Sequence, residues 1–296
     1  MKAYNEKDIK YSEIMQLIIL HTLYSLKESS NVYFQGGTAI RWCYSGSRFS
    51  EDLDFVTHLG KQRIDALISK MSEHIRRGMI AHFGVGEFEV RQRKTSGDTS
   101  FVSFFLFRPL KERKKVSVKV EFEKLKAGFF PQAEKMILSM LPFVRHLITV
   151  GEFRIPSPNS IILVETKEEI LSDKIRALLE RDYLKGGDFY DIWFLNSMNV
   201  RCDPELIKRK MIMYEAPFKS KREIDFFLNP GSKEKTQIIE AVQHDLSRFL
   251  SPQEISLFTN KDFKDIFDSL KVVLSSFKDE TFFLSAGRKK DRVGRE

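Results

Sequence analysis

Two neighbouring stretches decide which fold is expected of this chain: Gly36-Gly37-Thr38-Ala39-Ile40 and Arg48-Phe49-Ser50-Glu51-Asp52-Leu53-Asp54-Phe55. In the second stretch, apolar residues stand between and after two aspartates, a pattern that predicts a strand over residues 52–57. Alternate side chains of a strand point the same way, so Asp52 and Asp54 would project from one face. Two adjacent carboxylates repel each other unless a positive charge lies between them, and a divalent cation is the simplest way to supply it.

The glycine pair suggests what accompanies that cation. Residues 32–35 predict a short strand that ends at Gly36, and glycine lets a ligand approach the backbone closely. Thr38 is expected to be the N-cap of a short helix over residues 38–44, with free backbone N–H groups turned toward an anion. The two stretches together predict a site for Mg²⁺ or Mn²⁺ and a phosphorylated ligand.

Composition limits the class of protein. The chain has 296 residues, 42% of them hydrophobic and 30% charged, which suits one large domain or two ordinary ones. No run approaches the ~20 apolar residues needed to cross a bilayer, and residues 1–10 lack a signal-peptide core. Cys43 and Cys202 are far apart and outside any CxxC pattern. We therefore expect a cytoplasmic protein with no membrane partner and no zinc site.

The net charge of +8 permits a polyanionic partner, since lysine and arginine release counterions from phosphates. With a phosphate-binding site nearby, an RNA contact is a reasonable expectation, and the helical second half is where we expect the basic surface for it. The alternative is ordinary solvated charge with no nucleic acid partner.

The predicted secondary structure of the chain changes near Ser160. Before it, helical and alternating patterns mix, and we predict strands over residues 88–93, 100–108, 116–122 and 153–155 between helices over residues 11–28 and 61–77. After it, helical patterns dominate. We expect an α/β domain over residues 1–158, a helical domain over residues 159–285, and a basic, disordered tail over residues 286–296.

A third acid is expected on the alternating strand 116–122. Its valines face one way, and Lys119 and Glu121 face the other together with Glu123 just beyond. Three acids on neighbouring strands can hold two Mg²⁺ ions about 4 Å apart. Either Glu121 or Glu123 could be the third acid, or both could simply face solvent.

A second group of charges lies at a predicted helix–helix junction. Lys174 and Arg181 are two turns apart on one helix, and Asp188 and Asp191 are one turn apart on the next. They could contact a triphosphate and its metal, or they could form ordinary ion pairs. Arg48, just before the acidic strand, could likewise bind phosphate or pair with Glu51.

This combination resembles the nucleotidyltransferase superfamily with the polymerase-β-like fold, and more narrowly the AbiEii/AbiGii toxin family. The resemblance rests on the two opening stretches and on two later ones, residues 169–181 (EILSDKIRALLER) and residues 188–193 (DFYDIW). It implies an α+β protein, in which a nucleotidyltransferase domain with a mixed sheet flanked by helices is joined to a mainly α-helical bundle.

The resemblance also implies an activity and partners. Such proteins are toxins of bacterial toxin–antitoxin or phage abortive-infection systems, so a cognate antitoxin is expected. Members transfer nucleotides from NTPs, in some cases to tRNA 3′ ends. Carried over by position, the metal ligands would be Asp52 and Asp54, with Glu121 less securely third. The phosphate contacts would be Gly36, Gly37, Ser50 and Lys174, and Asp191 would complete the site.

The chain departs from the family pattern in two places. The gap between the glycine pair and Asp52 is long, and Gly187-Asp188 replaces the usual Arg-Asp of the last motif, which leaves Arg181 as the candidate to supply that arginine. Two other functions remain open. One is a catalytically silent nucleotide- or RNA-binding protein of the same fold, and the other is a metal-dependent nuclease, since clustered carboxylates also serve hydrolysis.

Overall fold

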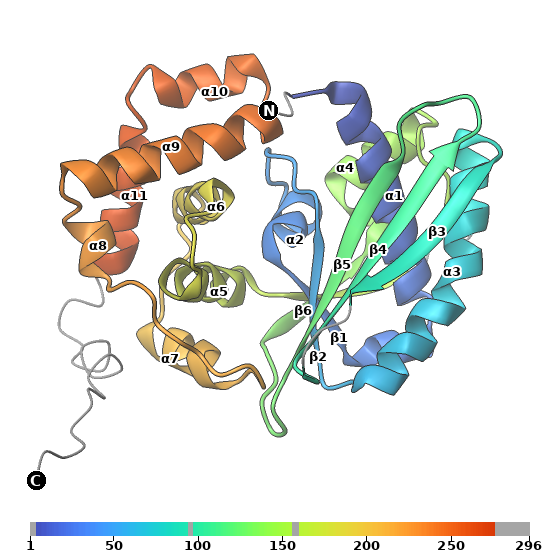
Figure 1. Ribbon diagram of the computed structural model, residues 1–296, viewed down its shortest axis with the longest axis horizontal. Coiled ribbons are helices and arrows are strands. Elements are labelled where there is room, and N and C mark those ends of the chain that lie inside the picture. Colours follow the sequence, from blue (N-terminus) through green and yellow to red (C-terminus); the bar gives the residue numbers. More distant parts are fainter. Residues whose placement is uncertain (1–3, 94–96, 156–159, 276–296) are drawn as a thin grey trace, which may run out of the picture. The chain divides into compact units, whose positions relative to one another are not determined.

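The computed structural model describes residues 4–93, 97–155 and 160–275. They form two compact units (Figure 1). The first unit contains Met1–Ile170 and Met213–Ala216, and the second contains Leu171–Ile212 and Pro217–Glu296. The expected boundary at residue 158 and the expected tail over residues 286–296 both lie outside the described residues. The division between the units falls inside a helix, after its first turn.

The first unit is built on one mixed seven-stranded sheet. Its strands are β1 (Val32–Gln35), β2 (Leu53–Thr57), β3 (Gly86–Arg93), β4 (Ser100–Pro109), β5 (Val116–Lys124), β6 (Ala133–Ile137) and β7 (Ile161–Glu165). Their order is β3-β4-β5-β2-β1-β7-β6. The β2–β5 and β1–β7 pairs are parallel, and the other neighbours are antiparallel. The predicted mixed sheet is confirmed.

Helices cover one face of this sheet. They are α1 (Glu6–Tyr24), α2 (Gly36–Cys43), α3 (Lys61–Phe83) and α4 (Pro142–Thr149), with short 3₁₀ turns at Lys27–Asn31 and Leu138–Met140. In Figure 1, α1 and α3 run behind β3, β4 and β5. A Cβ on Gly78 of α3 would lie 2.8 Å from the Ile18 side chain of α1, so the two helices pack at close range.

The centre of the sheet is aromatic on the face toward the helices. The ring of Phe55 in β2 lies 5.3 Å from that of Phe34 and 5.2 Å from that of Phe122, and all three are fully buried. Because strand side chains alternate, Asp54 points to the opposite face. On that face, Val56 is covered by Leu125 together with Met213 and Tyr214. The last two belong to Met213–Ala216, a short stretch in which the chain returns to the first unit and which we call the returning segment. The core therefore fixes which way the acids point.

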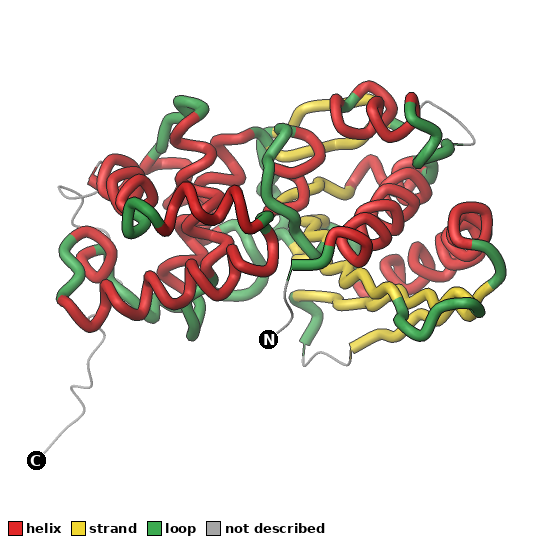
Figure 2. The backbone as a smooth tube through the Cα atoms, turned by 90° about the horizontal axis from the view of Figure 1, so that it is seen from above, coloured by secondary structure: helices red, strands yellow, loops and turns green. Residues whose placement is uncertain are grey.

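The second unit contains helices and connecting loops, and the strands seen in Figure 2 all belong to the first unit. Its helices are α5 (Lys167–Glu180), which begins in the first unit, α6 (Gly186–Ser197), α7 (Pro204–Ile212), α8 (Asp225–Leu228), α9 (Ser232–Phe249), α10 (Pro252–Thr259) and α11 (Lys264–Ser275). Helix α6 packs against α9 and α11. The prediction of a mainly helical second half is confirmed.

One predicted strand is wrong and two strands escaped prediction. Residues 153–155 form no strand, because the N–H of Phe153 donates to the carbonyl of Leu147 at the end of α4. The missed pair is β6 and β7, at the far edge of the sheet. The residues of β6 are all partly or fully exposed, and β7 is a run of four apolar residues and a glutamate directly before α5, so neither shows a distinct alternating pattern. Among the helices of the described residues, none has the length and apolar character that a membrane span requires.

Candidate active site

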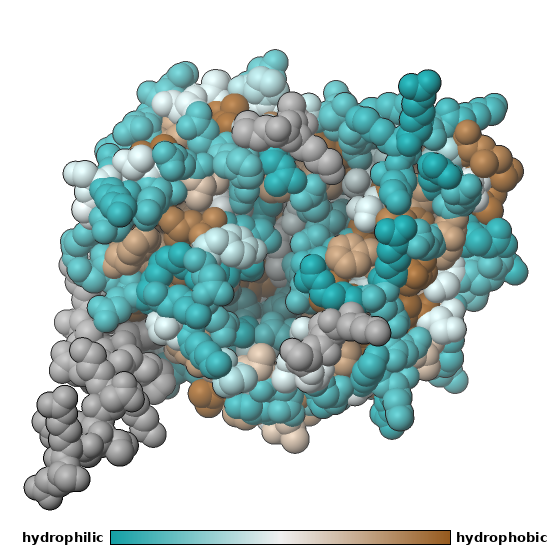
Figure 3. All heavy atoms as spheres, in the orientation of Figure 1, coloured by the Kyte–Doolittle hydropathy of each residue, from teal (hydrophilic) through white to brown (hydrophobic). Residues whose placement is uncertain are grey.

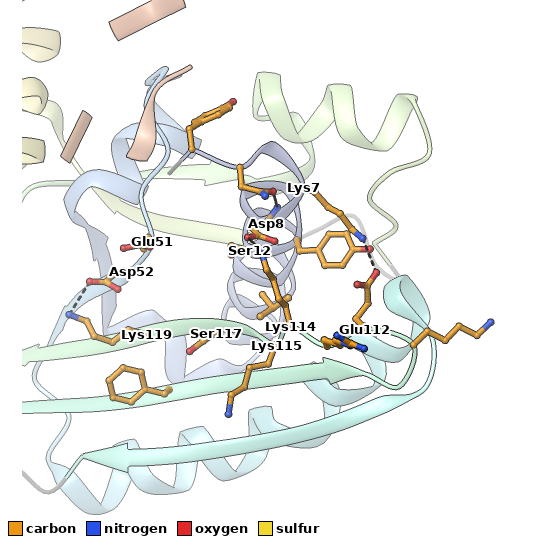
Figure 4. A pocket seen from close by; sticks show the side chains of 17 residues that line it. Lys7, Asp8, Ser12, Glu51, Asp52, Glu112, Lys114, Lys115, Ser117 and Lys119 are labelled. Carbon is orange, nitrogen blue, oxygen red and sulfur yellow. Dashed lines mark hydrogen bonds and ion pairs between the residues drawn. The ribbon is translucent and has the colours of Figure 1, made fainter. Parts of the chain in front are cut away.

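Three carboxylates meet on the open face of the sheet. Asp54 in β2 lies beside Glu121 of the parallel strand β5, and Asp52 stands one residue before β2. The Nζ atom of Lys119 lies 3.0 Å from Asp52 Oδ2 and 3.0 Å from Glu121 Oε2, and Figure 4 shows Lys119 pointing toward Asp52. We call these four residues the acid cluster.

Lys119 supplies the positive charge that the carboxylates need. Burial alone lowers the pKa of its ammonium group, but the charges of Glu121, Asp52 and Asp54 outweigh this and hold the pKa above its ordinary value. The side chain is therefore a cation at neutral pH. The sequence interpretation treated Lys119 only as a solvent-facing neighbour. The available signal was its position two residues before Glu121, on the same strand face.

The register of the β2–β5 pair distinguishes between Glu121 and Glu123, the two candidates for the third acid. Glu121 lies opposite Asp54, whereas Glu123 lies opposite Val56, two residues further from the loop that carries Asp52. Because neighbouring strands are about 4.8 Å apart, the residue directly opposite is the one able to share a ligand with Asp54. The geometry favours Glu121.

The glycine pair is needed for a specific reason. Gly36 has φ = 79°, in the left-handed region, and a Cβ there would lie 2.7 Å from Asp54 Oδ2. Glycine therefore leaves room for the Asp54 carboxylate at the start of α2. The N-cap of this helix is Gln35, and the helix begins at Gly36. The expectation that Thr38 is the N-cap is wrong, because the helix begins two residues earlier and Thr38 lies in its first turn.

Three consecutive carbonyls of the loop before β2 are held by buried side chains. The Thr38 hydroxyl donates to the carbonyl of Asp52. The side-chain amide of Gln16 in α1 donates to the carbonyls of Ser50 and Glu51, at 2.6 and 3.1 Å. These contacts position the acidic loop against two helices.

Gln16 was missed from the sequence. Its side chain is fully buried, and its oxygen accepts a hydrogen bond of 3.1 Å from the Trp42 indole. A single amide inside an apolar helical run is the signal that could have identified it, because a buried polar group requires partners.

Two further predicted residues lie in the same loop. Arg48 is buried, and its guanidinium donates to the carbonyl of Phe49 at 3.0 Å. Ser50 is also buried, directly before the acids. Gly37 occupies the first turn of α2, where backbone N–H groups have no partner within the helix. The structure thus gathers the predicted residues of the first unit around the loop and the start of α2.

The predicted residues of the second unit form a separate, buried network. Lys174 Nζ lies 2.8 Å from Asp188 Oδ1 and 2.7 Å from Asp191 Oδ2, and Arg181 Nε lies 3.1 Å from Asp188 Oδ2. Burial alone raises the pKa of Asp188, but the charges of Lys174 and Arg181 reverse this and hold it well below its ordinary value. The four residues are an ion-pair network that we call the buried network.

Close packing explains the diglycine that opens α6. A Cβ on Gly186 would lie 2.2 Å from the carbonyl oxygen of Ala241 in α9. The N–H of Gly187 donates to Asp245 Oδ2 at 3.1 Å. A larger residue at position 186 would push the two helices apart, which gives a physical reason for glycine at the start of this motif.

The acid cluster suits a divalent cation in its chemistry. Carboxylate oxygens are the ligands that Mg²⁺ and Mn²⁺ prefer, and the ammonium of Lys119 marks a place where positive charge is stabilised. Within residues 4–93, 97–155 and 160–275, no three His, Cys, Asp or Glu side chains are already arranged as a metal site. The carboxylates would have to turn from Lys119 toward the ion, which their partial exposure allows.

The fold is that of nucleotidyltransferases. The structure of JHP933 from Helicobacter pylori has a TM-score of 0.54 and 15% identity, with 96% of this chain and 99% of that chain covered. A second H. pylori structure, described as a nucleotidyltransferase, has a TM-score of 0.50 and 15% identity, with coverages of 92% and 96%. At this identity the likeness shows the fold alone. No match to a curated protein sequence was found.

The family follows from the sequence match. The model of the family described as "Nucleotidyl transferase AbiEii toxin, Type IV TA system" matches residues 19–270. The chain belongs to this family of nucleotidyltransferase toxins, and the resemblance inferred from the motifs is confirmed. Membership of a type IV toxin–antitoxin family implies a cognate antitoxin.

Proposed function

We propose that this toxin transfers a nucleotide from an NTP to a hydroxyl group of an RNA acceptor such as tRNA. The observation that carries the proposal is the meeting of Asp52, Asp54 and Glu121 on one sheet face beside the glycine start of α2. Carboxylates placed next to an anion-binding helix start suit a ligand that contains both a metal ion and phosphates.

The triphosphate would bind at the start of α2. The N–H groups of Gly36, Gly37 and Thr38 lie in its first turn, at the positive end of the helix dipole. Ser50, in the loop held by Gln16, would add a further contact, and Arg48 a positive charge. The buried Thr38 hydroxyl already holds the Asp52 carbonyl, so its side chain acts by positioning.

Asp52, Asp54 and Glu121 would hold Mg²⁺ or Mn²⁺. When bound, such an ion polarises the phosphates and balances charge on the leaving pyrophosphate. The acceptor oxygen would attack the α-phosphorus in line, forming one P–O bond as the bond to the bridging oxygen of the pyrophosphate breaks. The hydroxyl proton would pass to a carboxylate of the acid cluster.

The buried network would contribute from the second unit. We propose that Lys174 and Arg181 contact phosphate and that Asp188 and Asp191 hold these cations in place. The support is the order of the motifs along the chain and the two aspartates at 2.7–2.8 Å from Lys174. Contact between Lys174 and an NTP would require one of these ion pairs to loosen.

The test is transfer of label from each of four α-³²P-labelled NTPs to total tRNA, with and without Mg²⁺. We expect a labelled RNA product that the Asp54→Asn variant fails to form, with at least a 10³-fold loss of rate because a direct ligand is removed. Asp65→Asn on α3, a partner of Lys61 at 3.0 Å, is the matched control and should keep full activity. Absence of labelled product with all four NTPs would refute the proposal.

A silent nucleotide-binding protein is the second candidate, and one observation favours it. Lys119 already forms ion pairs with two of the three carboxylates, so its positive charge offsets part of their mutual repulsion without a metal. Binding of NTP with no turnover would support that function. Shortened RNA on the same gel would instead indicate a nuclease.

We further propose that the protein acts in the cytoplasm, where NTPs and tRNA are found, and that its antitoxin opposes the nucleotide transfer.

A further inference from the structure

A groove leads away from the acid cluster within the first unit. It has a volume of about 1130 Å³ and is lined by the start of α1, by the connection between β4 and β5, and by the open face of β5. Glu51, Asp52 and Lys119 lie at its inner end, and Figure 4 shows the side chains that line it. We call it the basic groove.

The outer wall of the basic groove is a run of cations. Lys111, Arg113, Lys114 and Lys115 all come from the β4–β5 connection, and all four are exposed. Within the described part of the chain, Lys111 and Arg113 form no ion pair. Basic side chains outnumber acidic ones among the residues that line the groove. A wall of exposed, closely spaced cations matches the phosphates of a nucleic acid backbone.

The acids of the outer groove are already neutralised. Lys7 pairs with Glu112 at 2.8 Å, and Lys114 pairs with Asp8 at 2.9 Å. Both pairs link α1 to the β4–β5 connection, and the Lys7–Glu112 pair is marked in Figure 4. Exposed pairs of this kind contribute little stability, so their lysines can exchange a carboxylate for a phosphate at low cost.

The floor of the groove offers an aromatic ring. Phe104 of β4 lines the groove and lies opposite Lys119 in the strand register, with Arg91 of β3 on its other side. Its ring is only partly buried. Figure 3 shows hydrophilic side chains over these strands with apolar ones between them. A partly exposed ring with cations on both sides suits a stacked base.

The length of the groove suits a short stretch of single-stranded RNA. Lys115 lies directly before β5 and precedes Lys119 by four residues, which corresponds to about 13 Å at about 3.3 Å per extended residue. At about 3.4 Å per stacked nucleotide, this distance holds three to four nucleotides. The basic run and the acid cluster are therefore placed to contact one strand end at the same time.

We propose that the basic groove binds the single-stranded 3′ end of the RNA acceptor. Its phosphates would lie along Lys111, Arg113, Lys114 and Lys115, a base would stack on Phe104, and the terminal hydroxyl would reach the acid cluster. The inference rests on the proposed function and moves the RNA surface from the helical half, where the sequence suggested it, to the first unit. An acidic polypeptide would match the cations but would leave Phe104 unused.

Binding of a fluorescein-labelled 12-nucleotide single-stranded RNA, followed by anisotropy, tests the proposal. The variant Lys111→Glu with Arg113→Glu should bind at least ten-fold more weakly at 0.1 M salt, because two phosphate contacts become repulsive. The slope of log affinity against log salt should fall by about 1.4, at about 0.7 for each lost contact in a single strand. Binding of a labelled NTP should stay unchanged.

The matched control makes the same charge change on another surface. Arg63→Glu with Arg77→Glu alters two exposed arginines of α3, on the opposite face of the sheet, and should leave RNA binding within two-fold of wild type. Equal RNA affinities of the wild-type and groove-variant proteins, or an equal loss in both double variants, would overturn the proposal. So would poly-glutamate binding that the groove variant loses while it keeps RNA.

The inference and the proposed function can fail separately. If wild-type protein transfers no label but its RNA binding depends on Lys111 and Arg113, the groove is supported and the transferase function is refuted. If label transfer occurs at the same rate in the groove variant as in wild type, at limiting RNA, the function stands and the groove proposal is wrong.

Discussion

The acid cluster and the buried network use the same arrangement in different surroundings. In each, one lysine lies within about 3 Å of two carboxylates. The side chains of Lys119, Asp52 and Glu121 are 27%, 30% and 34% exposed, whereas those of Lys174, Asp188 and Asp191 are 8%, 1% and 1% exposed.

The difference in exposure sets what each group can do. Water screens an exposed pair and can replace either partner, so the acid cluster can release Lys119 in favour of another cation at little cost. A buried pair has no such replacement, and removing one partner leaves an uncompensated charge. The acid cluster is therefore suited to exchange ligands, and the buried network is suited to hold charges in fixed positions.

The largest effect is expected from breaking the buried network. Lys174→Met should lower the free energy of unfolding by about 3–5 kcal/mol, because it removes the ammonium group that contacts two buried carboxylates, those of Asp188 and Asp191. Urea unfolding followed by circular dichroism measures this. Lys208→Met on α7, where an exposed partner, Glu205, lies at 2.8 Å, is the matched control and should change stability by less than about 1 kcal/mol. Equal losses of stability in the two variants would contradict the difference between buried and exposed ion pairs.

A smaller effect is expected from Asp188→Asn, and it should depend on pH. The folded pKa of Asp188 is depressed, so its charge favours the folded state above the ordinary aspartate pKa of about 3.9 and loses this effect as pH falls below it. The variant should be about 1–3 kcal/mol less stable than wild type at pH 7. Unfolding at pH 7, 5 and 3.5 should show the gap narrowing only below about pH 4; a constant gap would contradict the assignment.

Gly36→Ala tests the crowding beside Asp54. Both Gly36 (φ = 79°) and Gly84 (φ = 78°) are in the left-handed region, but only at Gly36 would a Cβ meet another group. Each alanine should cost about 1–2 kcal/mol of stability through its backbone. Only Gly36→Ala should also reduce label transfer, by at least ten-fold, because it displaces the Asp54 carboxylate. Equal activities of the two variants would show that the contact is unimportant.

The smallest effect on stability is expected from Lys119→Met. Because the acid cluster is partly exposed, the free energy of unfolding should change by less than about 1 kcal/mol. Affinity for Mn²⁺, measured by electron paramagnetic resonance, should rise several-fold because no ammonium competes for the carboxylates. Lys124→Met on the same strand removes an exposed pair with Asp98 and should leave that affinity unchanged. Unchanged Mn²⁺ affinity in Lys119→Met would mean that the lysine and the ion do not compete.

The sequence predicted what depends on local periodicity. Strand alternation predicted that Asp54 and Glu121 project from a strand face, and helical periodicity predicted that the second half is mainly helical. Both predictions depend only on the local geometry of the chain. Local patterns could mark Gln16 and Lys119 as unusual, but they could not assign the partners of these side chains. Their roles depend on which loop or strand lies beside them, and that is decided by long-range packing. The prediction of a strand at residues 153–155 was wrong for the same reason, since the backbone N–H of Phe153 donates to a carbonyl of α4 and not to a neighbouring strand.

The returning segment, Met213–Ala216, has a consequence for how the protein is made. The chain passes between the units after Ile170, after Ile212 and after Ala216. A gene fragment that stops at residue 170 therefore omits the strand-like piece in which Tyr214 bridges Leu125 and shields Val56. During synthesis, the first unit stays incomplete until residue 216 has left the ribosome, so it can complete its fold only after Leu171–Ile212 of the second unit has also emerged.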